Sequence, residues 1–275
     1  MVWQSPKPTC RRCSGYISSE ECHELVIHAS PWVLLDAGLC SRRRRGALRR
    51  MSQDQPELVT APQREVVCAD AIPWLRERGQ IEGACAVTSL PDVSELGVAL
   101  NVWRDWFHGA VQLVVDAVPE VSAALFFQSD IKHEGRWIDK GAMVVRAAED
   151  AGAHVLFHKI VCRRPPGMLT TGRPGFTHLI AVSRAMKCPD VLPIPDVITD
   201  AGEQKWVRAM GVRAAAHAVR FAQDQVGARV VLDPFCGVGT VLSVANALGL
   251  DAIGVEKARK RAEQARELRV TAAEL

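Results

Sequence analysis

The segment that most constrains the fold is residues 229–240, which read R-V-V-L-D-P-F-C-G-V-G-T. Its apolar run at residues 230–232 suits a buried parallel strand that ends at Asp233. Gly237 and Gly239 then allow a tight turn that a ligand can approach closely, and a helical pattern follows. A strand, a glycine turn and a helix N-terminus together predict a site for a nucleotide-like cofactor.

A second acidic residue follows the next predicted strand. Residues 252–255 read A-I-G-V, and Glu256 comes directly after them. An acidic side chain at this place can accept hydrogen bonds from both hydroxyls of a ribose. The dinucleotide spacing G-x-G-x-x-G is absent, and no Lys follows the second glycine as it would in a P-loop. The cofactor is therefore expected to contain a ribose but to be neither a dinucleotide nor a nucleoside triphosphate.

These two segments resemble the S-adenosylmethionine-dependent methyltransferases, in particular the amino-methyltransferases of nucleic acids. In that family D-P-F-x-G-x-G-T forms the loop at the methionine end of the cofactor, and a later Glu holds the ribose. The resemblance implies that S-adenosyl-L-methionine is the cofactor and that Glu256 binds its ribose. It also implies a set of loop residues that line the cofactor, namely Asp233, Phe235, Gly237, Gly239 and Thr240. The alternative is a generic Rossmann-like turn that binds another nucleotide.

The length and composition indicate a soluble cytoplasmic protein. A chain of 275 residues suffices for one α/β domain plus an extension. No run of about 18 uninterrupted apolar residues occurs, so no membrane span is expected. Nine scattered cysteines, an odd number, favour a reducing cytosol over a disulfide framework. We expect no membrane partner and no metal in the site.

Residues 1–50 differ in charge from the rest of the chain. They hold nine of the 34 Lys and Arg and four of the 31 Asp and Glu, which leaves 25 against 27 in residues 51–275. We expect a basic, disordered extension over residues 1–50 and a methyltransferase domain over residues 51–275. One alternative is a zinc site, with ligands Cys10, Cys13, Cys22 and His23. Another is translation that begins naturally at Met51.

From residue 65 onward, predicted strands and helices alternate. The strands fall at residues 65–69, 84–87, 122–128, 154–162, 178–183, 230–232 and 252–255, and the helices at 71–78, 100–118, 139–151, 206–225, 240–248 and 257–268. This alternation predicts an α/β fold with a mostly parallel sheet and helices on both faces. By resemblance it is the Rossmann-like class I methyltransferase fold, with seven strands and a terminal antiparallel hairpin at residues 154–183.

The order of the motifs resembles a permuted class of amino-methyltransferases, in which the catalytic half precedes the cofactor loop. The resemblance covers about residues 64–270 and includes D-A-x-x-x-L, which begins at Asp70. It implies that Asp70 contacts the adenine of the cofactor. Lys205 and Trp206, with Gln204, would stand where that class has a K-P element beside the cofactor. Asp70 also suits a helix N-cap, and Trp206 also suits the core.

The predicted strand at residues 84–87 is followed by the tetrapeptide Ser89-Leu90-Pro91-Asp92. The family pattern here is S/D/N-P-P-Y/F, whose first residue and next carbonyl hold the target amine while the aromatic ring stacks on the flipped base. The resemblance implies catalytic positions at Ser89, Pro91 and Asp92. Leu90 replaces the first proline, and Asp92 replaces the aromatic ring. Asp92 either holds or deprotonates the acceptor, or it caps a helix, because D-V-S-E reads as a capping box.

Two groups of nearby side chains have alternative roles. Trp103, Trp106 and Phe107 could supply the missing aromatic platform, or they could lie in the core at helical spacing. Arginines in the predicted loop at residues 163–177 could contact phosphate or lie on an ordinary solvated loop. They are Arg163, Arg164 and Arg173.

No target-recognition domain is visible between the predicted elements. A chain of this size suits a substrate with its own shape, such as structured RNA, or a partner protein that supplies recognition. We therefore expect an S-adenosylmethionine-dependent N-methyltransferase that acts on an exocyclic amine of a nucleic-acid base, with RNA favoured over DNA. The alternatives are methylation of a protein or small-molecule amine, and a catalytically degenerate methyltransferase fold that binds RNA or a partner.

Overall fold

The structure is a computed structural model that describes residues 61–275. The expected basic extension at residues 1–50, the alternative zinc ligands within it and the alternative start at Met51 all lie outside the described residues. In the part of the chain that is described, no helix is long and apolar enough to cross a membrane.

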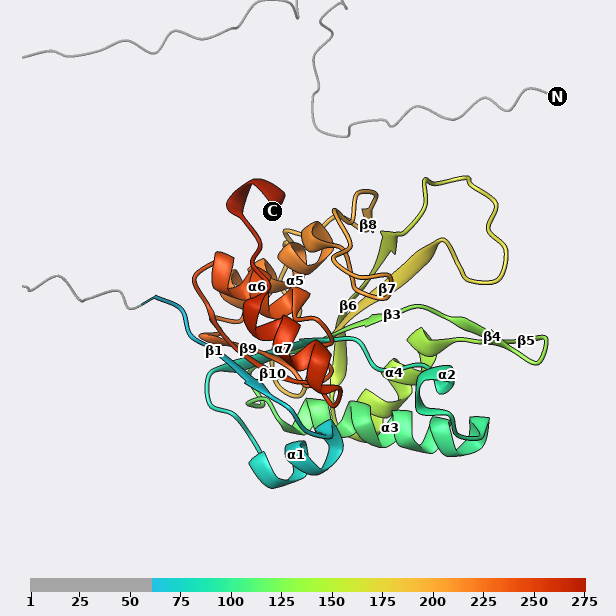
Figure 1. Cartoon of the computed structure of the whole chain (residues 1–275), viewed down its shortest axis with the longest axis horizontal. Helices are drawn as coiled ribbons and strands as arrows, with labels where there is room; N and C mark the ends of the chain where they lie inside the picture. The colour runs from blue at the N-terminus through green and yellow to red at the C-terminus, as the bar shows by residue number, and fades with distance from the viewer. Residues whose placement is uncertain (1–60) are drawn as a thin grey trace, which may run out of the picture. The chain divides into compact units, whose positions relative to one another are not determined.

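An eight-stranded sheet forms the centre of the described domain, with strand order β1-β10-β9-β2-β3-β7-β6-β8 (Figure 1). The first five strands in this order are parallel: β1 (Arg64–Val67), β10 (Asp251–Val255), β9 (Val230–Asp233), β2 (Ala84–Thr88) and β3 (Ala124–Gln128). β7 (Phe176–Ser183) runs antiparallel to both β3 and β6 (His154–Cys162), which confirms the predicted hairpin. The short β8 (Val197–Ile198) pairs with β6, so the sheet has eight strands and not the predicted seven.

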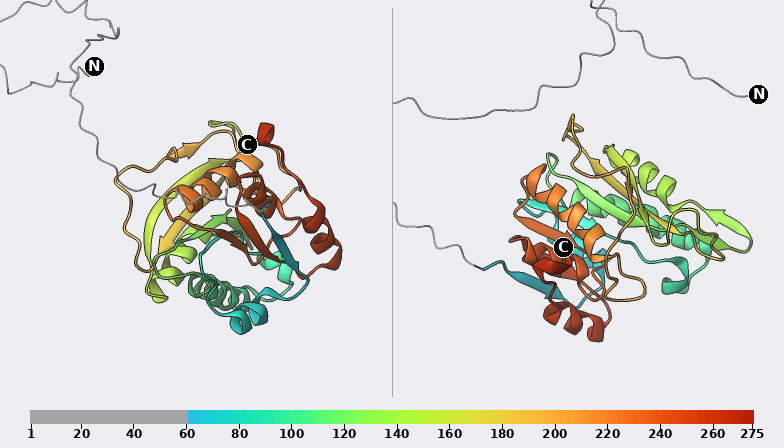
Figure 2. Two further views of the ribbon diagram at one scale, coloured as in Figure 1. Left: turned by 90° about the vertical axis from the view of Figure 1, so that its left-hand side faces the viewer. Right: turned by 90° about the horizontal axis from the view of Figure 1, so that it is seen from above.

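Helices cover both faces of this sheet, as predicted (Figure 1). α1 (Ala71–Arg78), α3 (Leu100–Asp116) and α4 (Lys140–Asp150) contribute to one apolar cluster. α5 (Val212–Asp224), α6 (Thr240–Ala247) and α7 (Arg259–Glu267) contribute to the other. Two further views show the same arrangement (Figure 2). Along β3, Leu125 belongs to one cluster and Phe126 to the other, because successive side chains of a strand point to opposite faces.

The helix predicted for residues 206–225 is wrong at its start, since α5 begins only at Val212. Gly211 precedes it in an extended conformation, with φ −69° and ψ 151°. A Cβ atom on Gly211 would lie 2.0 Å from the carbonyl oxygen of Ala201, so the backbone is packed too closely there for any larger residue. Lys205 and Trp206 therefore lie in the loop before α5.

Besides β8 and a 3-10 turn at Ala272–Glu274, a short helix and a short hairpin are additional to the predicted strands and helices. α2 (Val93–Leu96) begins after Asp92, which is the N-cap residue that the capping-box pattern indicated. β4 (Ile131–His133) and β5 (Arg136–Ile138) form a separate two-stranded hairpin. Each of its strands has only three residues, shorter than the runs by which a strand is recognised in a sequence.

Candidate active site

The main pocket lies at the carboxyl ends of four adjacent parallel strands, β1, β10, β9 and β2. Its wall includes a polar residue that ends or closely follows each of them: Asp70, Glu256, Asp233 and Ser89. Parallel α/β sheets bind ligands at this edge. The predicted cofactor residues that line the pocket are Asp70, Trp206, Asp233, Phe235, Gly237, Thr240 and Glu256. Gly239 and Lys205 do not line it.

Asp233 ends β9 and is buried. Its Oδ1 accepts hydrogen bonds from the Thr88 hydroxyl at 2.7 Å and from the Phe235 N–H at 3.2 Å. Burial raises the pKa of Asp233 to about 7, since an ionised carboxylate loses its hydration there; the charge of Glu256 adds to the rise, and the two hydrogen bonds oppose it. Thr88 ends β2, so this hydrogen bond joins the strand of the cofactor loop to the strand of the tetrapeptide.

The two glycines of the loop have different roles. Both adopt positive φ, +55° at Gly237 and +84° at Gly239. A Cβ atom on Gly237 would meet nothing within 4 Å, so the backbone there stays open to a ligand. A Cβ atom on Gly239 would lie 2.8 Å from the Cα of Ala265 in α7. Gly239 thus allows close packing of the loop on α7, and the structure does not bring it to the pocket.

Thr240 begins α6 and lines the pocket with a buried hydroxyl. Among the described residues this hydroxyl has no hydrogen-bond partner. Buried polar groups are normally paired, and an unpaired one calls for an explanation. Its position at a helix N-terminus, beside the open backbone of Gly237, suits a ligand with polar groups.

Glu256 follows β10, and one of its two carboxylate oxygens is already occupied. Oε1 accepts hydrogen bonds from Arg261 at 2.8 and 3.1 Å and from the Ala258 N–H at 2.7 Å. The Arg261 guanidinium in turn lies 5.6 Å from the centre of the Trp206 ring. Oε2 makes no hydrogen bond to a described residue, so it can accept one from a ligand. Arg261 fixes the carboxylate and places the Trp206 ring at the pocket wall.

Asp70 is the N-cap of α1, as one of the two alternatives predicted, and it also lines the main pocket. Its Oδ1 accepts the Ile72 N–H at 3.1 Å and so caps α1, while its carboxylate lines the pocket. Lys257 donates a hydrogen bond to Oδ2 at 2.9 Å. This bond lowers the pKa of Asp70 from its ordinary value, with a further contribution from the Ile72 N–H. Asp70 is therefore ionised at the rim of the pocket at neutral pH.

Lys205 is directed away from the predicted cofactor. Its ammonium group forms ion pairs with Glu203 and with Glu274, near the end of the chain. These pairs raise the pKa of Lys205, the pair with Glu274 contributing most. Gln204 likewise bonds within its own loop, to the carbonyl of Ala209.

Cys236 lies within the loop and is buried. Burial raises the pKa of its thiol far above the ordinary value, and the nearby charges of Asp233 and Glu256 raise it further. Since the thiolate is the nucleophilic form of cysteine, Cys236 is not available as a nucleophile.

A second, smaller pocket adjoins the first beside the tetrapeptide. The two pockets share Ser89, Leu90 and an ion pair between Arg208 and Glu95. The Ser89 hydroxyl makes no hydrogen bond to any residue in the described range, so it can bind a ligand that reaches from one pocket into the other. The Pro91 carbonyl accepts a hydrogen bond from the Trp103 indole at 3.1 Å, which fixes the turn of the tetrapeptide.

Asp92 forms a buried ion pair that the sequence did not indicate. Its Oδ1 accepts a hydrogen bond from Lys140 at 2.5 Å, and its Oδ2 lies 3.3 Å from Arg173. Lys140 is only 3% exposed, and burial lowers the pKa of its ammonium group although the charge of Asp92 opposes the change. The Asp92 N–H also donates to the Glu95 carboxylate at 3.1 Å, which supports the helix cap. Asp92 therefore caps α2 and faces the second pocket as a paired carboxylate.

Two of the three aromatic residues after the tetrapeptide lie in the core, and the third lies at the main pocket. Trp103 and Phe107 are fully buried and belong to the core. Trp106 lines the main pocket and packs edge-on against Phe235, with ring centres 5.8 Å apart. None of the three lines the second pocket, whose one aromatic lining residue in the described range is the buried Phe127 of β3.

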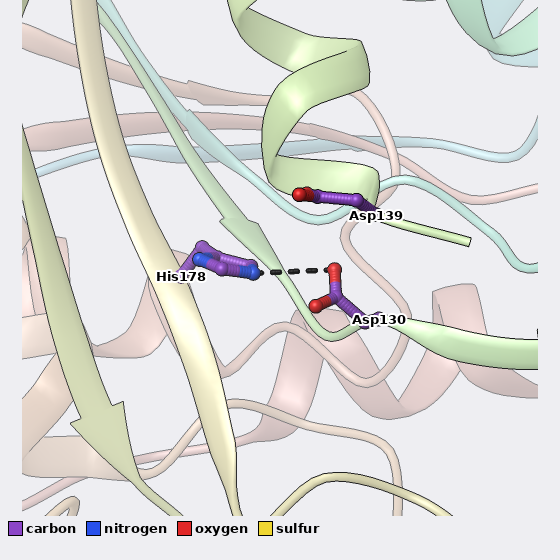
Figure 3. Close-up of side chains that lie close together, drawn as sticks. All are labelled: Asp130, Asp139 and His178. Atoms are coloured by element: carbon purple, nitrogen blue, oxygen red, sulfur yellow. Dashed lines mark hydrogen bonds and ion pairs between the residues drawn. The ribbon is translucent and has the colours of Figure 1, made fainter. Parts of the chain in front are cut away.

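A separate cluster of Asp130, Asp139 and His178 has the composition of a metal site (Figure 3). His178 Nε2 lies 3.2 Å from Asp130 Oδ1. Both carboxylates have a local function, however: Asp130 accepts the Lys140 N–H and Asp139 accepts the Ala142 N–H, each at 2.8 Å, at the N-terminus of α4. The positive end of a helix dipole favours anions and opposes a cation. We assign the two carboxylates to stabilising α4.

Three side chains of the site were absent from the sequence predictions. Thr88, Lys140 and Arg261 each bond to a predicted acidic residue, namely Asp233, Asp92 and Glu256. Arg261 follows Glu256 by five residues in a charged helix, a spacing that could have suggested the contact. Thr88 and Lys140 lie far from their partners in sequence, and no local pattern marks them.

The cofactor half of the chain also matches a known protein family. Residues 225–267 match the N6/N4 methyltransferase family, which is described as DNA methylase. The matched segment contains β9, the glycine loop, α6, β10 and α7. A comparison with the curated proteins finds no match.

Solved structures share the fold of this chain at low sequence identity. A protein described as a DNA modification methylase from Thermus thermophilus is 20% identical, with a TM-score of 0.59 over 75% of this chain and 93% of the other. The same protein in complex with S-adenosyl-L-methionine has a TM-score of 0.57 at 19% identity, over 74% and 92% of the two chains. The PvuII DNA methyltransferase, which is cytosine-N4-specific, has a TM-score of 0.61 at 11% identity, over 75% and 86%.

The chain thus has the class I methyltransferase fold and is similar to S-adenosylmethionine-dependent DNA methylases of the N4/N6 type. These matches are to DNA methylases, so the preference for RNA over DNA that the chain length suggested has no support.

Proposed function

We propose that this protein is an S-adenosylmethionine-dependent methyltransferase that methylates an exocyclic amine of a base in DNA. The observation that carries the proposal is the contact between two adjacent strand ends. The glycine loop follows β9 and the tetrapeptide follows β2, and the Thr88–Asp233 hydrogen bond joins them. A methyl donor in the main pocket and an amine beside Ser89 would therefore lie next to one another.

The residues of the main pocket fit S-adenosylmethionine. The unpaired Thr240 hydroxyl and the open backbone at Gly237 suit the polar methionine end of that molecule. The unoccupied Oε2 of Glu256 suits the ribose hydroxyls, and Asp70, Trp206 and Phe235 suit the adenine end and the pocket walls. When bound, the cofactor supplies an electrophilic methyl group on a sulfonium.

The tetrapeptide would position the acceptor amine. The Ser89 hydroxyl and the Leu90 carbonyl accept its N–H bonds, which keeps the nitrogen lone pair available, and Pro91 holds the turn rigid. Catalysis of this kind depends on orientation more than on covalent chemistry. The paired carboxylate of Asp92 faces the second pocket and anchors the acceptor there by a hydrogen bond. The buried thiol of Cys236 takes no part.

Cofactor binding and methyl transfer test this proposal in two steps. Titration calorimetry with S-adenosylmethionine should detect one site per chain. Transfer of tritiated methyl to unmethylated genomic DNA, total RNA and protein should label DNA, and mass spectrometry of the labelled nucleoside should identify an N-methylated base. A Ser89→Ala variant, which should still bind the cofactor, is the control for transfer. Label in RNA or protein but not in DNA would overturn the proposed substrate, and absence of cofactor binding would overturn the whole proposal.

A second candidate is a methyltransferase fold that binds its cofactor without turnover. The observation that favours it is the replacement of the family's aromatic ring by Asp92, whose carboxylate is held by Lys140 and Arg173. This candidate predicts tight cofactor binding with no transfer to any acceptor. The same two measurements separate it from the enzyme.

A further inference from the structure

The loop between β6 and β7, residues 163–175, extends from the sheet beside the second pocket (Figure 1). Residues 164–173 are all exposed. They include Met168 and Leu169, which are 57% and 95% exposed. Among the described residues, Leu169 is the most exposed large apolar side chain. A single exposed apolar residue is ordinary, but two adjacent ones at the end of a projecting loop indicate contact with another molecule.

The backbone of this loop is constrained on the approach to its apolar residues. Pro165 and Pro166 have fixed φ angles, and the Met168 N–H donates to the Pro165 carbonyl at 3.2 Å. Met168 and Leu169 are therefore presented by a defined turn. Two side chains on a constrained turn lose less backbone conformational entropy on binding than the same side chains on a flexible loop.

The base of the loop is joined to the acceptor pocket. The N–H groups of Arg163 and Arg164 both donate to the Gly175 carbonyl, at 2.7 and 3.1 Å. The Arg163 guanidinium bonds to Ser129, and that of Arg173 pairs with Asp92. Both arginines line the second pocket. The two ends of the loop thus form part of the wall of the pocket that would receive the target base, and the apolar pair lies between them in the chain.

The charge of the loop favours a nucleic acid as the molecule that it contacts. Residues 163–175 contain three arginines and no acidic residue. The positive charge suits the phosphate backbone of a nucleic acid, and the exposed apolar pair suits the stacked bases of a duplex. A base within a duplex must leave the stack before an enzyme can reach its amine, and proteins assist by inserting apolar side chains between base steps.

We propose that Met168 and Leu169 form a wedge that enters duplex DNA beside the target base, while Arg164 contacts the adjacent phosphates. The proposal rests on the proposed function and adds to it the element that opens the duplex. The acceptor is accordingly double-stranded DNA, and the second pocket receives the base that the wedge displaces.

The test compares methyl transfer to duplex genomic DNA by four forms of the full chain. Replacing both apolar residues, Met168→Ser with Leu169→Ser, should lower the rate at least tenfold. The conservative Leu169→Met should stay within about twofold of wild type, because methionine remains large and apolar. The surface control is Val121→Ser, since Val121 is 72% exposed and precedes the amino end of β3, whereas the loop follows the carboxyl end of β6. It should leave the rate unchanged.

Two further measurements define the outcome. The melting temperature and the affinity for S-adenosylmethionine should be the same in all four proteins, because the substituted side chains are exposed and do not line the main pocket. If the double serine variant methylates duplex DNA at the wild-type rate, or if Leu169→Met loses as much activity as that variant, the wedge is refuted. If the wild-type protein itself methylates no DNA, the proposed function has failed and the loop proposal fails with it.

Discussion

Replacement of Asp92 by Asn is the most informative single change at the acceptor pocket. In the folded protein Asp92 accepts a hydrogen bond from Lys140 at 2.5 Å and lies 3.3 Å from Arg173. Asparagine has nearly the same shape and caps a helix equally well. The change therefore removes the negative charge and little else, and it leaves the ammonium group of Lys140 buried without its main counter-charge.

The magnitude follows from this geometry. Removing one partner of a buried ion pair typically costs about 3–5 kcal/mol. The cost should be smaller here, because the side-chain carbonyl of the introduced asparagine can still accept a hydrogen bond from Lys140 and because the charge of Glu95 remains nearby. We expect a loss of about 2–3 kcal/mol in the free energy of unfolding, which for a domain of this size lowers the melting temperature by roughly 5–10 °C.

The loss should depend on pH in a defined direction. Burial already lowers the pKa of Lys140, and the charge of Asp92 opposes that shift, so Asp92→Asn should lower the pKa further. The destabilisation is largest where Lys140 is charged in both proteins and the wild-type Asp92 still carries its negative charge. As the pH rises above the pKa of Lys140 in the folded variant, the lysine loses its proton there, and the difference from wild type should shrink.

A double-mutant cycle supplies the measurement and the control. Asp92→Asn, Lys140→Met and the double variant are unfolded in urea at neutral pH. Each single variant should have a lower free energy of unfolding than wild type. The double variant should lose about 2 kcal/mol less than the sum of the two single losses, because a neutral pair replaces the ionic one. An Asp92→Asn protein as stable as wild type would refute the buried pair. The stable double variant then decides the role of Asp92: lost methyl transfer indicates an acceptor anchor, and normal transfer indicates a structural residue.

The other predictions concern the main pocket and its border. Ser89→Ala should lower the rate of methyl transfer about ten- to a hundredfold, because it removes one hydrogen bond of about 1–3 kcal/mol that positions the acceptor. The melting temperature should not change. Normal transfer by this variant would exclude Ser89 from the acceptor site. Because burial raises the pKa of Asp233 to about 7, the folded state binds a proton more tightly than the unfolded state, and the free energy of unfolding should fall as the pH rises from about 4 to 7. The Asp233→Asn variant, unfolded in urea, should not show this fall. If the fall persists in the variant, the raised pKa does not belong to Asp233. Gly237→Ala should weaken cofactor binding measured by calorimetry more than it lowers the melting temperature, whereas Gly239→Ala, whose methyl group would collide with Ala265, should show the opposite order.

The cofactor half of the site could be predicted because its signals are local. The strand, the turn and the helix of residues 229–248 are adjacent in sequence, and Glu256 follows within one further strand. Apolar runs and glycine spacing report such short-range structure well. The same locality explains why α1 was predicted with its observed bounds and why Asp92 was recognised as a helix cap.

The structure departs from the sequence predictions, or adds contacts to them, where tertiary packing decides the arrangement. The start of α5 depends on the close approach of Gly211 to the Ala201 carbonyl. The helical periodicity of the sequence does not predict this contact. Lys205 was assigned to the cofactor by its neighbours in sequence, but Glu274, 69 residues away, holds its ammonium group. Gly239 matched the glycine pattern of the loop, and its actual constraint is the backbone of α7.

The acceptor half was the least predictable because its chemistry is assembled from distant elements. The tetrapeptide alone suggested only that a stacking ring was missing at Asp92. The structure pairs that carboxylate with Lys140 of α4 and Arg173 of the β6–β7 loop, so the residue that replaces the family's ring belongs to a charged cluster. A ring holds any base by its face, whereas hydrogen-bonding groups depend on which donors and acceptors the base presents. If the second pocket receives the target base, as we propose, such groups would favour one base over general affinity for flipped bases, and opening of the duplex would depend more on contacts outside the pocket.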